Sequence, residues 1–302
     1  MNTTFRIGIG QIPSLQGEIE HNLDLMEAQV DKAAADGVSL VIFPELALTG
    51  YLVDKRFSDL AIGLEGETMD RLRELSRKAD IVTGFIEETP RHIFHNSAVH
   101  LSGGEILHVH RKIYLPTYGM FDERRYYGAG WDVGAYDTSS IRAAMLVCGD
   151  AWHLSLPYLA AHRGADLIMI IAASSTTGLA DTTPCDWAWK AMCSSYALTL
   201  SCFVVFANLA NATNGDYDFW GGSFVCAPDG STLAESDIAG PDLVACDLDP
   251  AVLREQRIRL PFRRDDSLAH TLSLGQQALG EKVALDRFHA PTPSAPMVTK
   301  PR

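Results

Sequence analysis

One segment of the chain combines strand, helix and strand patterns around a single cysteine. An apolar run at Ala143–Val147 leads into Cys148, and a helical pattern at Leu156–Arg163 and a second apolar run at Asp166–Ile171 follow. This order is typical of two parallel strands joined by a helix. A cysteine at such a strand end lies near outward-facing backbone N–H groups, which favour its thiolate. The segment therefore indicates a nucleophile, although a lone cysteine more often only packs in a core.

Similar patterns alternate along most of the chain. We expect further strands at Phe5–Ile9, Val38–Phe43, Ile81–Glu87, Asn96–Leu101, Ile106–Arg111, Leu167–Ile171, Cys202–Ala207, Ser223–Cys226 and Leu243–Asp247. Further helices are expected at Asn22–Ala35, Met69–Lys78 and Asp186–Leu200. The glycines after Ser102 predict a hairpin turn. The mixture predicts an α/β fold with sheets that are parallel in part and antiparallel in part, and with helices on the outside.

Composition and charge narrow the class of protein. The net charge of −13 argues against nucleic acid or an anionic membrane surface as a partner, because both require a basic footprint. No apolar stretch reaches the ~18 residues that a membrane span needs. The six cysteines lack paired spacing, which predicts reduced thiols and a cytoplasmic protein. No linker divides the chain, so we expect one domain over residues 1–285 and a tail over residues 286–302 that is disordered or packs on a partner subunit.

Three apolar strands end in reactive side chains, which are Glu45, Lys112 and Cys148. Because open α/β sheets bind ligands at the ends of their strands, these side chains are expected to meet at one edge. A carboxylate can take the proton of a thiol and later protonate a leaving amine. A lysine supplies positive charge where an oxyanion develops. This set suits attack on the carbon of an amide or a nitrile, although each of the two charged residues alone would more often be a solvated surface residue.

The three segments resemble the motifs of the carbon-nitrogen hydrolases, the nitrilase superfamily, over about residues 4–248. Phe43-Pro44-Glu45 with Thr49-Gly50-Tyr51 is similar to the glutamate motif. The stretch from Arg111 to Glu123 is similar to the lysine motif. Cys148-Gly149-Asp150-Ala151-Trp152-His153 is similar to the cysteine motif.

The resemblance implies a role for each residue of the motifs. Glu45 is implied as the general base, Lys112 as the oxyanion stabiliser and Cys148 as the nucleophile. Glu123 matches a second glutamate that positions substrate and lysine in amidase-type members. The resemblance also implies a four-layer α-β-β-α sandwich, a homodimer or larger homo-oligomer, and no cofactor. Gly149 stands where the family more often has a larger residue, so the pocket wall is expected to be enlarged or re-shaped.

Four residues are candidates for substrate binding, which are Tyr118, Gly149, Trp152 and Ser174. Tyr118 follows the lysine closely, Trp152 lies beside the cysteine, and Ser174 follows the next strand. Capping of a helix or loop is an equally good interpretation of Ser174. The other aromatic residues, Tyr51 and Trp189 among them, are expected to pack in the core.

The histidines suggest a metal site, but the spacing does not support one. Five of the ten lie between His92 and His110. No accompanying cysteine or carboxylate has the spacing of zinc ligands, so we expect exposed strand histidines and no metal.

The patterns together predict a cysteine hydrolase of non-peptide carbon-nitrogen bonds, with a small amide as first choice of substrate. A nitrile or an N-carbamoyl compound is the alternative substrate. The lysine and cysteine segments also resemble the glutaminase part of glutamine-dependent NAD synthetases. A binding or scaffold protein of the same fold, without catalysis, and a metal-dependent hydrolase are alternatives of other classes.

Overall fold

The computed structural model describes residues 4–51, 56–119, 121–176, 184–210, 218–236 and 240–289. The chain divides into a unit of residues 1–263 and a unit of residues 264–302. The second unit contains the helix α7 (Leu268–His289), and residues 290–302 of the predicted tail lie outside the described part of the chain. Everything that follows concerns the first unit.

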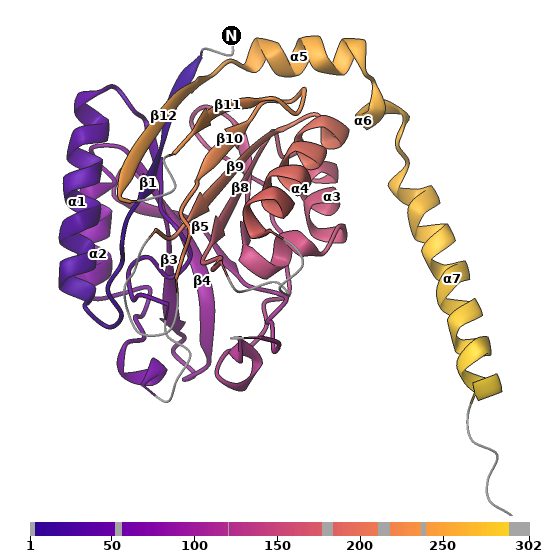
Figure 1. The fold of residues 1–302 in the computed structure, drawn as a ribbon, viewed down its shortest axis with the longest axis horizontal. Helices are drawn as coiled ribbons and strands as arrows, with labels where there is room; N and C mark the ends of the chain where they lie inside the picture. The colour runs from indigo at the N-terminus through magenta and orange to yellow at the C-terminus, as the bar shows by residue number, and fades with distance from the viewer. Residues whose placement is uncertain are drawn as a thin grey trace, which may run out of the picture. The chain divides into compact units, whose positions relative to one another are not determined.

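The first sheet has six strands in the order β12-β1-β2-β3-β4-β5 (Figure 1). Their bounds are Phe5–Gln11 for β1, Leu40–Ile42 for β2, Asp80–Glu88 for β3, Phe94–Ser102 for β4, Glu105–Arg111 for β5 and Asp242–Leu248 for β12. The strand β2 runs parallel to both of its neighbours, and the remaining pairs are antiparallel. The sheet is therefore mixed, as the sequence predicts.

The second sheet also has six strands, in the order β11-β10-β9-β8-β7-β6. Their bounds are Tyr136–Asp137 for β6, Arg142–Val147 for β7, Leu167–Ala172 for β8, Phe203–Asn208 for β9, Phe224–Cys226 for β10 and Thr232–Glu235 for β11. The central strands β7, β8 and β9 are parallel, and the outer pairs are antiparallel. The predicted strand-helix-strand unit around Cys148 is thus β7, α3 and β8.

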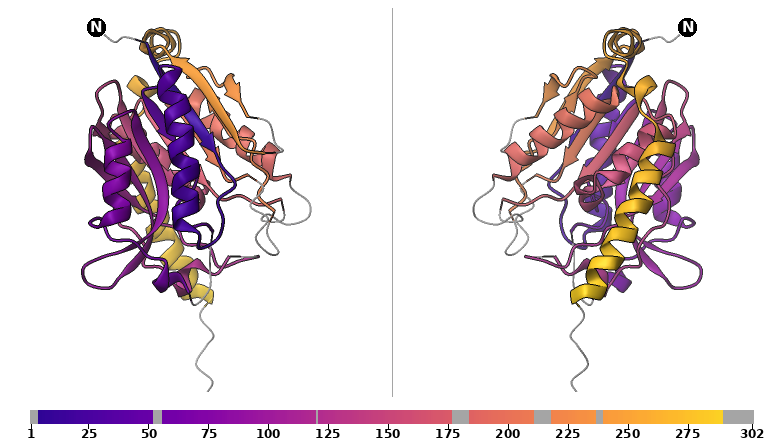
Figure 2. Two further views of the ribbon diagram at one scale, coloured as in Figure 1. Left: turned by 90° about the vertical axis from the view of Figure 1, so that its left-hand side faces the viewer. Right: turned by 90° about the vertical axis from the view of Figure 1, so that its right-hand side faces the viewer.

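Helices cover the outer face of each sheet, and the two sheets pack against each other (Figures 1 and 2). The helices α1 (Ile19–Ala35) and α2 (Glu67–Leu75) lie on the first sheet, and α3 (Ser155–His162) and α4 (Cys185–Leu200) lie on the second. The architecture is the four-layer α-β-β-α sandwich that the motifs imply.

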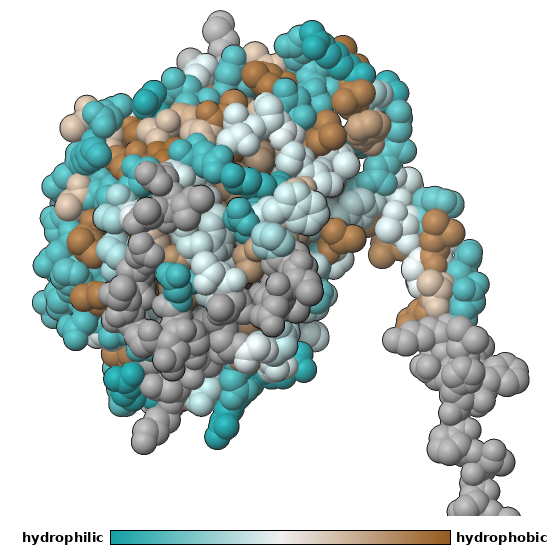
Figure 3. All heavy atoms as spheres, in the orientation of Figure 1, coloured by the Kyte–Doolittle hydropathy of each residue, from teal (hydrophilic) through white to brown (hydrophobic). Residues whose placement is uncertain are grey.

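The side chains of the short strand β2 pack into two different hydrophobic cores. Leu40 and Ile42 pack in the core between the sheets, whereas Val41 packs against the helices α1 and α2. Alternate side chains of a strand point to opposite faces, and both faces are covered here. This is why β2 is apolar throughout. The outward faces of α1 and α2 are largely hydrophilic (Figure 3), and Arg71 of α2 pairs with three carboxylates of α1.

Several element boundaries differ from the sequence prediction. The helix α1 begins at Ile19, three residues before the predicted start at Asn22. The helix α5 (Pro250–Arg259) was not predicted, although Asp249 caps it by accepting the Ala251 N–H at 2.9 Å. An N-cap aspartate followed by proline is a recognisable helix start. The hairpin between β4 and β5 is present as predicted, with Gly103 and Gly104 at positive φ.

The expectation of exposed strand histidines is wrong for four of the five, because His92 alone is exposed and His108 is half-buried. His95, His100 and His110 are buried, because the second sheet and neighbouring loops cover the strands β4 and β5. His110 Nε2 lies 2.8 Å from a carboxylate oxygen of Asp150, and His100 Nδ1 lies 2.9 Å from the Tyr136 hydroxyl. Within the described ranges, no group of three potential metal ligands occurs.

None of the described helices is both long and apolar enough to cross a bilayer.

Candidate active site

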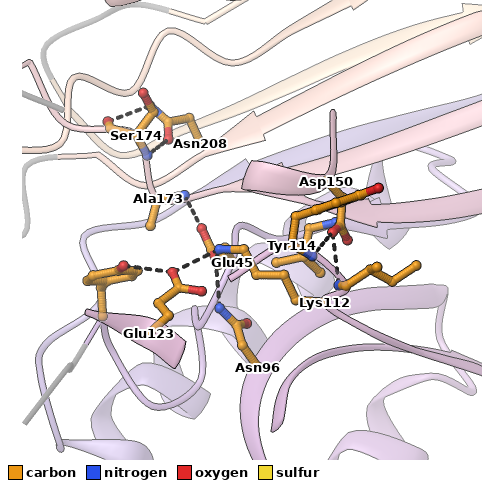
Figure 4. Close-up of polar contacts among 12 residues, drawn as sticks. Glu45, Asn96, Lys112, Tyr114, Glu123, Asp150, Ala173, Ser174 and Asn208 are labelled. Carbon is orange, nitrogen blue, oxygen red and sulfur yellow. Dashed lines mark hydrogen bonds and ion pairs between the residues drawn. The ribbon is translucent and has the colours of Figure 1, made fainter. Parts of the chain in front are cut away.

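Glu45 and Lys112, two of the residues predicted to act together, lie close to each other just beyond the ends of strands (Figure 4). Glu45 follows β2, Lys112 follows β5, and Cys148 follows β7 directly. Ala173 and Ser174 follow β8, the strand beside β7. The first sheet thus supplies the carboxylate and the ammonium, and the second sheet supplies the thiol. The expectation that the three residues share one edge of one sheet is therefore wrong, because the site forms between two packed sheets. All three predicted side chains are at least nine-tenths buried.

The carboxylate of Glu45 is held from three sides. Oε1 accepts hydrogen bonds from Asn96 Nδ2 at 2.7 Å and from Lys112 Nζ at 2.7 Å. Oε2 accepts the Ala173 N–H at 2.8 Å. A carboxylate oxygen can accept more than one hydrogen bond, so Oε2 keeps capacity for a further proton.

Lys112 is buried between two carboxylates. Its Nζ donates to Glu45 Oε1 at 2.7 Å and to Glu123 Oε1 at 2.8 Å. Burial opposes the charged form of Lys112, but the charges of Glu123 and Glu45 outweigh burial and raise its pKa well above the usual value. The ammonium therefore stays charged. It has three N–H donors, and its two carboxylate partners are the only ones among the described residues, which leaves one donor for another group.

Glu123 is also buried, and it has an unpaired oxygen. Oε1 accepts the Tyr51 hydroxyl at 2.8 Å in addition to Lys112. Oε2 is buried and has no hydrogen-bond partner among the described residues. Burial, with the nearby charge of Glu45, raises the pKa of Glu123 to about 7, against the opposing effect of Lys112. The second carboxylate of the site thus titrates near neutrality.

Cys148 lies where β7 turns into the short 3-10 helix Cys148–Trp152. Its φ is 43°, in the left-handed region that side chains with a Cβ rarely occupy. Burial raises the pKa of its thiol well above the usual value, and the charge of Glu45 raises it further, against Lys112 and the Ala173 N–H. The expectation that this position favours the thiolate is therefore wrong, because burial and the charges of Glu45 and Glu123 outweigh Lys112 and the Ala173 N–H. The resting group is a thiol that needs a base.

Asp150 connects the cysteine segment to the lysine loop, and it was not among the predicted site residues. Its Oδ1 accepts the backbone N–H groups of Ile113 and Tyr114, both at 2.9 Å. Its Oδ2 accepts the Val147 N–H at 3.2 Å and contacts His110 Nε2 at 2.8 Å. One fully buried carboxylate thereby fixes the chain on both sides of Lys112 relative to Cys148.

A cavity opens beside Cys148, and all four predicted substrate-binding residues line it. The lining consists of Cys148, the predicted residues Tyr118, Gly149, Trp152 and Ser174, and also Pro116, Phe121 and Trp189. Trp189, which was expected only to pack, contributes to the wall as well as to the core. Trp152 and Tyr118 are partly exposed at this cavity, whereas Ser174 and Trp189 are buried.

Gly149 re-shapes the wall through the backbone rather than leaving open space. A Cβ at this position would lie 2.9 Å from the carbonyl oxygen of Tyr114 and 3.5 Å from Lys112 Cε. The lysine loop thus occupies the volume that a side chain would fill. The glycine was expected either to enlarge the pocket or to re-shape its wall, and in the structure the wall is re-shaped.

Three further site residues were missed, namely Asn96, Tyr51 and Asn208. Asn96 lies near the start of β4, where a polar residue resembles an ordinary solvent-facing position. Tyr51 is part of the glutamate motif, and its place in that motif is the sequence feature that could have identified it as a site residue. Asn208 ends β9, and its side chain binds both the N–H and the carbonyl of Ser174, at 2.7 and 3.2 Å. Its position at the end of a strand is the sequence feature that could have identified Asn208 as a site residue.

Comparison with known proteins places the chain in a family. The carbon-nitrogen hydrolase family model matches residues 6–258. The omega-amidase NIT2 of Homo sapiens is 28% identical over 275 residues, which cover 87% of this chain and 95% of that protein. A glutamine-dependent NAD(+) synthetase of Acinetobacter baylyi is 28% identical over 173 residues, which cover 57% of this chain and 32% of the synthetase. The chain thus matches about a third of the length of that synthetase.

A solved structure has the same fold. A carbon-nitrogen hydrolase from Helicobacter pylori G27 superposes with a TM-score of 0.78 at 22% sequence identity, covering 90% of this chain and 98% of that chain. The family model covers most of the first unit, and the two-sheet sandwich agrees with it. The protein therefore belongs to the carbon-nitrogen hydrolase family.

Proposed function

We propose that the protein is an amidase, which releases ammonia from a small amide through a thioester on Cys148. The observation that carries this proposal is the buried array of Glu45, Lys112 and Glu123 at the strand end beside a cavity-lining thiol. We further propose that the enzyme acts as a cytoplasmic homo-oligomer.

The first step forms the bond between sulfur and carbon. Glu45 takes the thiol proton, and Oε2 has the free acceptor capacity for it. The sulfur attacks the carbonyl carbon of the amide, and the π electrons move onto the oxygen. We assign the stabilisation of that oxyanion to the remaining N–H of Lys112 and to the backbone N–H of Gly149, which follows Cys148 and lines the cavity.

The second step breaks the carbon-nitrogen bond. Glu45 returns its proton to the nitrogen, and ammonia leaves as the carbonyl re-forms in a thioester. Water then attacks the thioester while Glu45 takes one of its protons. When the carbon-sulfur bond breaks, that proton returns to the sulfur, and the carboxylic acid and the thiol are released. Atoms and charges balance without any further reagent.

The unpaired oxygen of Glu123 supports an amide rather than a nitrile. Oε2 is a buried acceptor without a donor among the described residues. The NH₂ group of an amide would supply a donor, whereas a nitrile carries none. A buried acceptor left unpaired costs about 1–3 kcal/mol, which an amide substrate would relieve. The similarity to an omega-amidase agrees with this choice.

Ammonia release by purified protein tests the proposal. The panel includes aliphatic amides, aromatic amides, glutamine, N-carbamoyl compounds and nitriles. Wild type and Cys246→Ala, which removes a half-buried cysteine away from the cavity, should release ammonia from an amide. Cys148→Ala should be inactive. Activity of Cys148→Ala equal to wild type would contradict the proposed mechanism, and no release from any compound by wild type would contradict the amidase.

A further inference from the structure

Ser174 lies on the wall of the cavity, and its backbone is held in a fixed position. Ser174 directly follows Ala173, whose N–H binds Glu45 (Figure 4). The amide of Asn208 accepts the Ser174 N–H at 2.7 Å and donates to the Ser174 carbonyl at 3.2 Å. Asn208 is itself anchored, because its Nδ2 also donates to the Gly221 carbonyl at 3.0 Å. The backbone at Ser174 therefore has little freedom to move.

Both lone pairs of the Ser174 hydroxyl are already used. Ser174 Oγ accepts the indole N–H of Trp189 at 2.9 Å and the indole N–H of Trp220 at 3.1 Å. An indole N–H can only donate, and a hydroxyl has two acceptor lone pairs and one donor. Both indoles are buried, so neither N–H has water as an easy substitute. The one remaining capacity of the hydroxyl is therefore to donate its proton.

That proton has no acceptor among the residues that the structure describes. Among the described residues, the hydrogen-bond partners of Ser174 Oγ are the two indoles, and it accepts from both. Because Ser174 lines the cavity together with Cys148, the open side of the hydroxyl is the side that a bound substrate would occupy. The other walls are mostly aromatic, from Phe121, Trp152 and Trp189.

We infer that Ser174 is a specificity-determining residue, whose hydroxyl donates a hydrogen bond to an acceptor oxygen on the acyl group of the substrate. This inference rests on the proposed amidase function. It identifies the substrate class as small amides whose acyl chain carries an ether, carbonyl or carboxylate oxygen. An ammonium group at the same point would meet a donor and would be disfavoured.

Matched pairs of amides test this inference. 2-Methoxyacetamide and butyramide have nearly the same shape, and so do 3-methoxypropanamide and pentanamide, but only the first of each pair has an acceptor oxygen. The ratio of kcat/KM within a pair is measured for wild type and for Ser174→Ala. Comparing the two proteins removes the intrinsic reactivity difference between the amides. In at least one pair the ratio should fall about five- to tenfold in Ser174→Ala, which is the effect of one neutral hydrogen bond.

Two variants separate the hydroxyl from a general disturbance of the wall. Ser174→Thr keeps the hydroxyl and should keep the wild-type ratio. Ser194→Ala removes a serine of α4 that binds the Gly230 carbonyl outside this cavity, and it should also keep the ratio. Trp220→Phe frees one lone pair of the Ser174 hydroxyl, which can then accept, so turnover of glycinamide relative to butyramide should rise several-fold.

Each outcome has a distinct meaning. A ratio that is the same in wild type and Ser174→Ala for both pairs would overturn the inference and leave the amidase standing. If Ser174→Ala does not fold, an unchanged glycinamide preference in Trp220→Phe overturns the inference in the same way. If no amide releases ammonia in a Cys148-dependent manner, the proposed function and this inference fall together.

Discussion

At the scale of single residues, the site depends on one buried cation between two buried carboxylates. Lys112 binds Glu45 and Glu123, and the side chains of all three are fully buried. An ammonium in this position neutralises charge that would otherwise be costly to bury. The same charge is available to a developing oxyanion. The lysine therefore contributes both to folding and to the proposed chemistry.

Removal of the lysine charge should reduce stability and activity together. In Lys112→Met the two carboxylates remain buried without a partner, so the free energy of unfolding at neutral pH should fall by about 3–5 kcal/mol. Urea denaturation measures this change. Part of the loss should be recovered at pH 5, where the carboxylates take up protons. Lys78→Met, which removes an exposed ion pair with Asp31, should change stability little. Equal effects of the two variants would contradict the account.

The second carboxylate should control the pH dependence. The pKa of Glu123 is raised to about 7, and its proposed role is to accept an N–H of the substrate in the ionised form. Glu123 is protonated below this pKa and ionised above it, so kcat/KM should rise as the pH increases through about 7. Glu123→Gln should lower kcat/KM and remove this dependence. A profile of Glu123→Gln that still rises near pH 7 would assign the transition to another group.

At the scale of elements, the site depends on how strand ends are joined. Asp150 fixes the segment after β7 to the backbone that follows β5, through Ile113 and Tyr114. Gly149 allows the carbonyl of Tyr114 to approach closely at the same junction. The distance between the thiol and the ammonium is therefore set by backbone contacts rather than by the two side chains alone.

Asp150→Asn tests this junction. The variant replaces a charged acceptor by an amide with only one acceptor oxygen, so some of its backbone N–H partners lose their bonds. We expect a loss of about 2–3 kcal/mol in the free energy of unfolding, measured in urea, and a lower kcat. Asp137→Asn alters an exposed carboxylate on β6 that pairs with Arg142, and it serves as the control. Wild-type stability and kcat in Asp150→Asn would show that the junction does not depend on this carboxylate.

The sequence predicts some of these features and not others. Glu45, Lys112 and Cys148 follow strong apolar runs and lie in recognisable motifs, and the α/β order is readable from periodicity. Asn96 and the buried histidines are different, because their surroundings come from strands and loops far away in the sequence. The raised pKa of Cys148 was also not predictable, since it results from burial and from a carboxylate of the other sheet.

At the scale of the whole first unit, the two halves of the site come from different sheets. Glu45 and Lys112 follow strands of the first sheet, and Cys148 and Ser174 follow strands of the second. The site therefore exists only when the sheets are packed against each other. The apolar core between them, which includes Ile9 and Ile42, is a condition of function as well as of stability.

Ile9→Ala tests this dependence. Ile9 is fully buried in the core between the sheets, so the free energy of unfolding should fall by about 2–5 kcal/mol. The loss of ammonia release and the change in intrinsic tryptophan fluorescence should occur at the same urea concentration, because the site cannot remain assembled once the two sheets separate. Ile258→Ala removes a side chain that is 63% exposed and should be nearly neutral. Activity that persists in urea after the fluorescence change would contradict the dependence.

The central claim is that Cys148 carries the acyl group during turnover. The most direct measurement is peptide mass spectrometry. The protein is mixed with an amide that it hydrolyses, the reaction is quenched in acid during turnover, and the protein is then digested into peptides. In the wild-type protein, the peptide that contains Cys148 should gain the mass of the acyl group, and the peptides that contain the five other cysteines should not. In Glu45→Gln, the Cys148 peptide should not gain this mass. An adduct on another cysteine, or steady turnover with no adduct at any time point, would contradict the account.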